Sequence, residues 1–195
     1  MILIVSAVFP PEPVVTAQIS SDLAYCLSAL NSVTTVSPRP TRPYGTVFKN
    51  QKNKDTPFEV KTVRSYVHPG PSFIGRMLES ISFGRATRKV IRERHSEISV
   101  VYANTWPLFA QYAVTRTCKK LNIPLVIHVQ DIYPETLTDR LGLIGPLVKA
   151  LLMPMEKYVM SKATAVLAIG NKMAEYLASS RDIDKNKITV VYNWQ

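Results

Sequence analysis

The sequence predicts an α/β fold with one doubly wound, mostly parallel, Rossmann-like sheet of about seven strands and helices on both faces. Short apolar runs alternate along the chain with segments whose apolar residues recur at helical spacing. Most of the short runs are apolar throughout, which is typical of parallel strands covered on both faces. With 195 residues, 46% of them hydrophobic, the chain can bury one substantial core, so we expect a single domain.

Three strands are expected in the first half of the chain. Residues 2–7 form a continuous apolar run, and 32–37 form the next one. Between them, residues 17–30 carry apolar side chains at helical spacing. Prolines then stop regular structure, and the polar, lysine-rich residues 44–57 predict a surface loop. Residues 58–65 alternate in polarity and are rich in β-branched residues, which predicts the third strand.

The second half of the chain repeats a helix–strand unit four times. The expected helices are 72–95, 107–121, 145–161 and 172–179, and the expected strands are 98–103, 125–130, 164–169 and 188–192. Ligands of such sheets bind outside the carboxyl ends of the strands. The loops that follow the strands are 8–16, 104–106, 131–135, 170–171 and the residues from 193 onward.

The sequence shows no membrane-spanning or secretory segment. The longest apolar stretch, 141–155, is interrupted by glycine, proline and Lys149, and the amino terminus lacks a basic region and a cleavage site. Cys26 and Cys118 both fall in helical patterns, so we expect core residues and not a disulfide. These features predict a cytoplasmic protein.

Positive charge is concentrated in one segment. The formal net charge is +10, and residues 39–94 carry thirteen bases against four acids, whereas residues 1–38 carry no base. This asymmetry indicates an anionic partner on one side of the molecule, or a basic solvated surface. The segment lacks aromatic interleaving and any nucleic-acid-binding motif, so we do not expect nucleic acid as the partner.

Several common site motifs are missing. The chain contains no GxG, no GxxxxGK[ST], no GxSxG and no clustered cysteine and histidine spacing. The first strand is followed by a loop without glycine, whereas a dinucleotide site needs glycines so that the backbone can approach a pyrophosphate. The sequence therefore predicts no metal and no cofactor, and argues against NAD, ATP and metallohydrolase chemistry.

The stiff first loop is one candidate part of a ligand cleft. Pro11 and Glu12 lie in the proline-rich stretch that follows the first strand. Glu12 either faces the cleft or favours the dipole of the next helix. Asn104, Gly170 and Asn193 are cleft candidates because each follows a later strand.

Polar residues at the end of the 125–130 strand form the most informative stretch. A buried strand rarely tolerates polar side chains such as His128 and Gln130, whose desolvation usually implies a use. Asp131 stands where the strand ends and could accept a proton or a hydrogen bond from a substrate hydroxyl. His128 is a donor to substrate or a satisfied core histidine. Tyr133 stacks on a sugar or packs in the core.

The long helix 72–95 combines apolar residues with many bases. Such a helix rests on an anionic membrane surface, or is an ordinary amphipathic helix with a charged outer face. The candidate membrane-surface residues are Arg76, Arg85, Arg88, Lys89 and Arg92.

Three stretches together resemble a known family. The opening ILIVSAVFPPE, the central HVQDIYPE and the closing VVYNW are similar, in this order, to the N-terminal domain of glycosyltransferase family 4 enzymes, which have the GT-B fold. The pattern is most similar to bacterial capsule and O-antigen enzymes related to fucosamine transferases. The resemblance covers the whole chain.

The resemblance implies a retaining transfer from a nucleotide sugar without a metal. It implies that residues 1–195 are the acceptor-binding domain and that a C-terminal domain, absent from this chain, binds most of the nucleotide sugar. Asp131 and His128 would then be catalytic residues on the acceptor side, and Glu12 would face the donor diphosphate. Two departures are plain: Val14 and Val15 replace the glycine pair that many members carry in the first loop, and the donor-binding Glu-x7-Glu pair is missing.

We therefore expect the acceptor half of a glycosyltransferase that modifies a lipid-linked glycan in bacterial surface polysaccharide synthesis. It would work as a peripheral protein on the inner face of the plasma membrane, and this chain alone would be inactive. The alternative is a non-catalytic subunit that recruits a separate donor-binding chain to the membrane.

Overall fold

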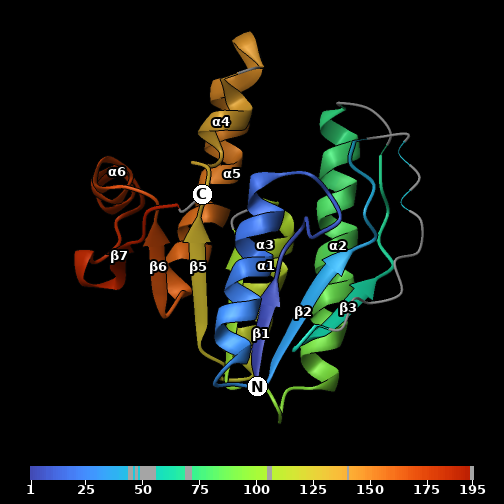
Figure 1. Ribbon diagram of the computed structural model, residues 1–195. Coiled ribbons are helices and arrows are strands. Elements are labelled where there is room, and N and C mark those ends of the chain that lie inside the picture. The colour runs from blue at the N-terminus through green and yellow to red at the C-terminus, as the bar shows by residue number, and fades with distance from the viewer. Residues whose placement is uncertain are drawn as a thin grey trace.

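The computed structural model describes residues 1–43, 46, 48, 56–68, 72–104, 107–139 and 141–193. Its centre is a sheet of seven parallel strands in the order β3-β2-β1-β4-β5-β6-β7 (Figure 1). The strands are β1 Ile2–Val5, β2 Val33–Pro38, β3 Glu59–Val63, β4 Val100–Asn104, β5 Leu125–Val129, β6 Ala165–Ala168 and β7 Ile188–Val190. The expected doubly wound, seven-stranded sheet is thus confirmed.

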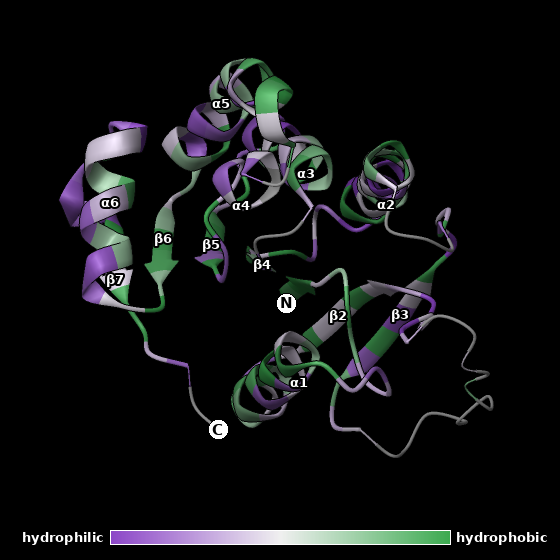
Figure 2. Cartoon of the chain, turned by 90° about the horizontal axis from the view of Figure 1, so that it is seen from above, coloured by the Kyte–Doolittle hydropathy of each residue, from purple (hydrophilic) through white to green (hydrophobic). Residues whose placement is uncertain are grey.

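Helices cover the two faces of the sheet unequally. The helical segments are α1 Val15–Ser28, α2 Phe73–Glu93, α3 Leu108–Lys120, α4 Glu135–Thr138, η1 Gly142–Ile144, α5 Gly145–Lys162, α6 Asn171–Arg181 and η2 Lys185–Lys187. Helix α1 lies on one face, and α2, α3 and α5 lie on the other (Figure 2). This division follows from right-handed crossovers, because the strand order reverses direction at β1.

The core consists of two apolar layers, one on each face. The larger layer joins Leu3 and Val166 of the sheet to Phe83 of α2 and Val159 of α5. The smaller layer packs Ile4, Phe9 and Phe58 beneath α1. Since the larger layer spans both halves of the strand order, the described residues form one folding unit.

Most element boundaries agree with the sequence-based prediction to within a few residues. Helix α1 begins at Val15, two residues earlier than expected. Pro107 precedes the first residue of α3. Most of the predicted surface loop 44–57 lies outside the described residues.

The cysteines are both free, as expected from their helical positions. Cys118 is buried, and burial raises the pKa of its thiol to about 12. Cys26 is exposed, so the prediction that it is a core residue was wrong. None of the helices within the described residues has the length and apolarity needed to cross a membrane.

Candidate functional site

The carboxyl ends of the strands bring most of the predicted cleft residues to one edge. Since all seven strands are parallel, the loops after β1, β4, β5, β6 and β7 meet there. Pro11 and Glu12 follow β1, Asn104 ends β4, and Gly170 precedes α6. Asn193 Nδ2 donates to Gln130 Oε1 at 3.1 Å, which joins the residues after β7 to those after β5.

His128 is enclosed beside Tyr102 of the neighbouring strand. The two residues lie on β5 and β4, and His128 Nδ1 is 2.5 Å from the Tyr102 hydroxyl. Gln130 Nε2 lies 3.1 Å from the ring nitrogens of His128. Burial lowers the pKa of His128 to about 4 and raises that of Tyr102. The imidazole is therefore neutral near pH 7, with its hydrogen bonds made to neighbouring side chains.

Asn104 belongs to a second buried polar group at the ends of β1 and β4. Its amide nitrogen donates to Ser20 Oγ at 2.5 Å and to Ser6 Oγ at 3.3 Å. Gln111 Nε2 donates to the Asn104 carbonyl at 3.2 Å. These contacts fasten the end of β4 to α1 and α3. The Asn104 side chain is 3% exposed, so it supports the loops at this edge from beneath.

Glu12 points toward the segment that follows β2. Its Oε1 accepts hydrogen bonds from the backbone amides of Thr41 at 2.6 Å and Arg42 at 2.9 Å. Glu12 does not cap the next helix, because no side chain accepts a hydrogen bond from the first amides of α1. Glu12 instead ties the first loop to residues 41–42.

A shallow groove opens beside Glu12, and the sequence analysis did not predict it. Its lining comes from the ends of the first three strands and from α2, and includes Glu12, Arg42, Tyr66 and Glu79. Glu79 Oε2 forms ion pairs with Arg76 at 2.8 Å and Arg42 at 3.4 Å, and its Oε1 accepts from His68 N at 2.6 Å. The one sequence signal was Glu79, the only acid of α2 before its last residue, Glu93.

Asp131 and Tyr133 lie on the loop after β5. Asp131 is exposed and, within the described residues, forms no hydrogen bond or ion pair, so its carboxylate is open to a ligand. Tyr133 lines a second, apolar groove between the beginnings of α2 and α3, together with Phe73, Met77 and Leu108. The structure therefore places Tyr133 beside the helices and not among the residues around Gln130.

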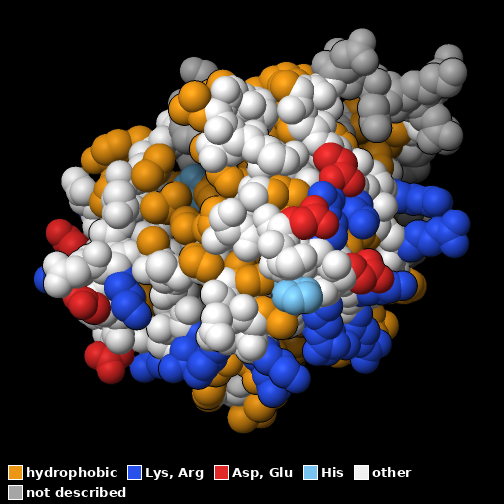
Figure 3. Space-filling view, turned by 90° about the horizontal axis from the view of Figure 1, so that it is seen from below, with side chains coloured by type: hydrophobic (Ala, Val, Ile, Leu, Met, Phe, Trp, Pro, Cys, Tyr) orange, Lys and Arg blue, Asp and Glu red, His pale blue; other side chains and the backbone are white. Residues whose placement is uncertain are grey.

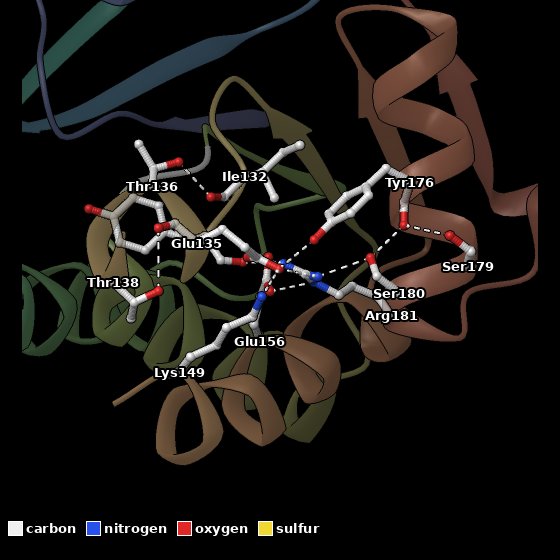
Figure 4. A network of polar contacts seen from close by, with 11 residues as sticks. Ile132, Glu135, Thr136, Thr138, Lys149, Glu156, Tyr176, Ser179, Ser180 and Arg181 are labelled. Carbon is white, nitrogen blue, oxygen red and sulfur yellow. Dashed lines mark hydrogen bonds and ion pairs between the residues drawn. The ribbon is translucent and has the colours of Figure 1, made fainter. Parts of the chain in front are cut away.

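A buried ionic network holds this loop, as Figure 4 shows. Arg181, at the end of α6, donates to the Tyr133 carbonyl and to Glu135 Oε2, both at 2.5 Å, and to Glu156 Oε2 at 2.6 Å. Tyr176 and Lys149 also reach Glu135, at 2.8 and 3.3 Å. The sequence could not reveal this network, because its members come from α4, α5 and α6.

The pKa values of the two glutamates in this network are shifted in opposite directions. Burial opposes ionisation of Glu135, but hydrogen bonds from Arg181 and Tyr176 hold its pKa at about 2. Burial dominates at Glu156 and raises its pKa to about 7, although Arg181 favours the carboxylate. Near neutral pH, Glu135 is therefore ionised beside Arg181, whereas Glu156 is only partly ionised.

Basic residues gather at the opposite end of the molecule. Figure 3 views the molecule from below, where lysine and arginine side chains cluster around the amino ends of the strands. Helices end at this edge, and their last turns carry Arg92, Lys119, Lys120 and Lys162. Cations there interact favourably with helix carboxyl termini. The described residues contain no group of side chains that could hold a metal ion.

The five predicted membrane-surface residues of α2 are spread along the helix. Arg76 is in its first turn, at the carboxyl edge, and is paired with Glu79. Arg85, Arg88, Lys89 and Arg92 are exposed and approach the opposite edge. They therefore do not lie beside the candidate cleft.

Comparison with known proteins identifies the family. The profile of Glycosyltransferase Family 4 matches residues 21–194, which is most of the chain. The chain belongs to glycosyltransferase family 4. No curated protein sequence matches it.

Solved structures of GT-B glycosyltransferases share the fold of this family 4 chain. HepE from Anabaena, in complex with UDP and glucose, superposes with a TM-score of 0.59 at 17% identity, covering 100% of this chain and 44% of HepE. MurG from Acinetobacter baumannii superposes with a TM-score of 0.52 at 12% identity, covering 100% of this chain and 46% of MurG. The apo form of UGT2 from Phytolacca americana superposes with a TM-score of 0.60 at 11% identity, covering 100% of this chain and 51% of UGT2. The chain thus spans about half the length of these structures.

Proposed function

We propose that this family 4 chain is the acceptor-binding half of a retaining glycosyltransferase that uses a nucleotide sugar. A C-terminal domain outside this chain binds most of the donor, and the acceptor is a lipid-linked glycan of bacterial surface polysaccharide synthesis. The enzyme acts on the inner face of the plasma membrane.

The meeting of the strand-end loops at one edge carries this proposal. In a family 4 protein, this edge is where a ligand of a parallel sheet is expected. The edge presents the exposed Asp131 carboxylate after β5 and, after the first three strands, a groove bordered by Glu12 and Arg42. Structures of HepE were determined with UDP and with UDP-glucose, which supports a nucleotide sugar as the donor here.

The residues have distinct roles in this proposal. Asp131 accepts a hydrogen bond or a proton from the acceptor hydroxyl, because its carboxylate is exposed and has no partner among the described residues. His128 orients Gln130 from below, and the pair shapes the floor of the acceptor site with Asn193. Gly170 leaves room near the amino end of α6, where a Cβ would meet nothing within 4 Å.

The test is the substitution Asp131→Asn in the longest natural protein that contains this chain. Transfer from a panel of radiolabelled nucleotide sugars to a membrane extract would first identify the donor. Asp131→Asn should then lower kcat/KM by about 100-fold with little loss of stability, because a positioned general base contributes about that much. Asp139→Asn, an exposed control just after α4, should leave kcat/KM unchanged. Unchanged kinetics in Asp131→Asn would remove this residue from the site.

A non-catalytic recruiting subunit is the second candidate. The length of the natural reading frame separates the two candidates. A frame of about twice this length would contradict the subunit, because a second domain would follow in the same chain.

A further inference from the structure

The beginning of α5 carries an apolar surface with no partner among the described residues. Leu143, Ile144, Leu147 and Leu151, together called the apolar tip, are 102, 59, 75 and 77% exposed. Leu147 and Leu151 are spaced four residues apart on α5 and so share one face of the helix, and Leu143 and Ile144 belong to the turn η1 just before it. A single exposed leucine is ordinary, whereas a contiguous group of them marks an interaction surface.

The two halves of α5 differ in what they show to solvent. The helix buries Leu152, Glu156 and Val159 against the domain. Its second half exposes Lys157 and Lys162, as a surface helix normally does. Apart from Lys149, whose side chain is 40% exposed, its first half exposes only aliphatic residues and a proline. Packing of the domain core does not explain these leucines, because none of them belongs to either core layer.

The apolar tip stands at the same end of the molecule as the candidate site. Figure 1 shows the start of α5 projecting past the carboxyl ends of the strands. Helix α2 also begins at this end, and its Ile74 and Leu78 are 62 and 46% exposed. The apolar groove that contains Tyr133 and Leu108 lies between α2 and α3. Both apolar surfaces therefore lie on the face of the sheet that α2, α3 and α5 cover, at the end where the loop after β5 emerges.

The charges around this surface select one kind of partner. Between residues 141 and 155 the only charged side chain is Lys149, and in the first turn of α2 it is Arg76. The nearest acids along these helices, Glu79 and Glu156, are buried and paired with arginine. The exposed Asp139 lies just before this stretch, but the stretch itself combines exposed aliphatic side chains with one cation and no acid, a composition that fits the interface of an anionic bilayer.

We propose that the apolar tip inserts into an anionic lipid leaflet and so brings the loop after β5 to a membrane-borne acceptor. This deepens the proposed function and rests on it for the acceptor. It places the membrane contact at α5 and the first turn of α2, and not along Arg85, Arg88, Lys89 and Arg92. Those residues extend toward the other end of the molecule.

Vesicle flotation tests the insertion directly. The full chain should float with vesicles of equimolar phosphatidylglycerol and phosphatidylcholine. Leu147→Ser/Leu151→Ser should weaken this binding by about tenfold or more, since two leucines lose their burial in lipid. Leu30→Ser is the matched control, because Leu30 is 91% exposed at the other end of the molecule. Arg88→Glu/Arg92→Glu should retain at least half of the binding.

A fluorophore reports insertion independently of affinity. Leu147→Cys and Leu30→Cys, each in a Cys26→Ser background, would be labelled with an environment-sensitive dye, since Cys118 is buried. Emission should shift to the blue on vesicles for the label at position 147 only. Absence of flotation, equal loss in Leu30→Ser, or loss only in Arg88→Glu/Arg92→Glu would overturn the proposal. So would a dimer in light scattering that Leu147→Ser/Leu151→Ser dissolves without any vesicle binding.

These outcomes are separate from the fate of the proposed function. Vesicle binding needs no donor and no turnover, so its failure leaves the transferase proposal standing. Conversely, a protein that inserts normally but transfers no sugar would refute the transferase role while keeping the membrane surface.

Discussion

At the scale of single residues, Arg181 links the fold to the candidate site. It is among the largest fully buried side chains, and its guanidinium joins Glu156 of α5 to Glu135 and the Tyr133 carbonyl of the loop after β5. Buried charges are tolerated only when they are paired and hydrogen-bonded, and every described contact of Arg181 meets that condition. The position of the Asp131 loop therefore depends on a residue far away in sequence.

Arg181→Met should destabilise the domain by about 3–5 kcal/mol, because it leaves buried carboxylates without their cation. Urea unfolding followed by circular dichroism would measure this loss. Lys149→Met provides the comparison, since Lys149 is part of the same network but 40% exposed, and it should cost about 1 kcal/mol or less. Equal effects of the two substitutions would show that burial of the arginine is energetically unimportant.

His128 should make the stability depend on pH. Its folded pKa of about 4 lies below the ordinary value of 6.5, so the unfolded chain binds a proton that the folded chain does not. This contribution to stability is present above pH 6.5 and is lost as the pH falls toward 4, by up to about 1.4 kcal/mol per pH unit.

The difference in unfolding free energy between the natural chain and His128→Gln isolates this effect. Glu156, whose raised pKa acts in the opposite direction between pH 4.5 and about 7, is present in both proteins and cancels. The difference should shrink as the pH falls from 6.5 to 4.5. A difference that stays constant over this range would mean that His128 is not held neutral by burial.

At the scale of elements, the helix pair α2–α3 shapes the apolar groove beside the site. The two helices approach closely at Gly84, where an added Cβ would lie 2.8 Å from the Ala110 Cα. Buried Thr87 and Thr115 lie on these same helices. Small side chains therefore set the spacing of the helices.

Gly84→Ala should destabilise the protein by about 1–3 kcal/mol, although alanine favours helix by about 1 kcal/mol relative to glycine. The backbone of α3 cannot move aside as a flexible side chain would. Thermal unfolding would measure the loss, with the exposed neighbour Arg85→Ala expected to stay within about 0.5 kcal/mol of the natural chain. A stabilised Gly84→Ala would mean that α2 and α3 are further apart than the structure shows.

Elements were more predictable from the sequence than contacts between them. Apolar runs such as 2–7 and 125–130 indicate burial on both faces, so the strands and their parallel direction could be predicted from the local pattern. The partners of Glu12 could not be found in this way, because Thr41 and Arg42 are about thirty residues away and carry no periodic signal.

The same limit applies to the arginines. Arg181 and Arg42 resemble ordinary surface residues in the sequence, since arginine is rarely buried. Only the folded chain shows that one is enclosed and that the other borders a groove. The exposed leucines of α5 were likewise part of an expected helix, and the pattern did not show which face would stay uncovered.

At the scale of the whole molecule, the two ends of the sheet have different chemistry. The carboxyl end carries the candidate site and the apolar tip, whereas cations at helix ends gather at the amino end (Figures 1 and 3). The net charge of +10 is therefore not a measure of the site itself. The cations at the amino end would attract that end to an anionic surface, so contact through the apolar tip has to come from apolar insertion and from the few cations near it.

The apolar layer that joins both halves of the sheet should make the described domain unfold as one unit. Val36 of β2 and Val166 of β6 lie far apart in the strand order, yet both are fully buried in this layer. Val36→Ala and Val166→Ala should each cost about 2 kcal/mol and shift the entire urea transition with an unchanged slope, because each leaves a small cavity in a shared core. Circular dichroism and tyrosine fluorescence should report the same midpoint for each variant. The contrary result is a transition in two phases, of which Val36→Ala shifts one and Val166→Ala the other. It would show that the half bearing Glu12 and the half bearing Asp131 fold independently, so that the candidate site lies between two units with no common core.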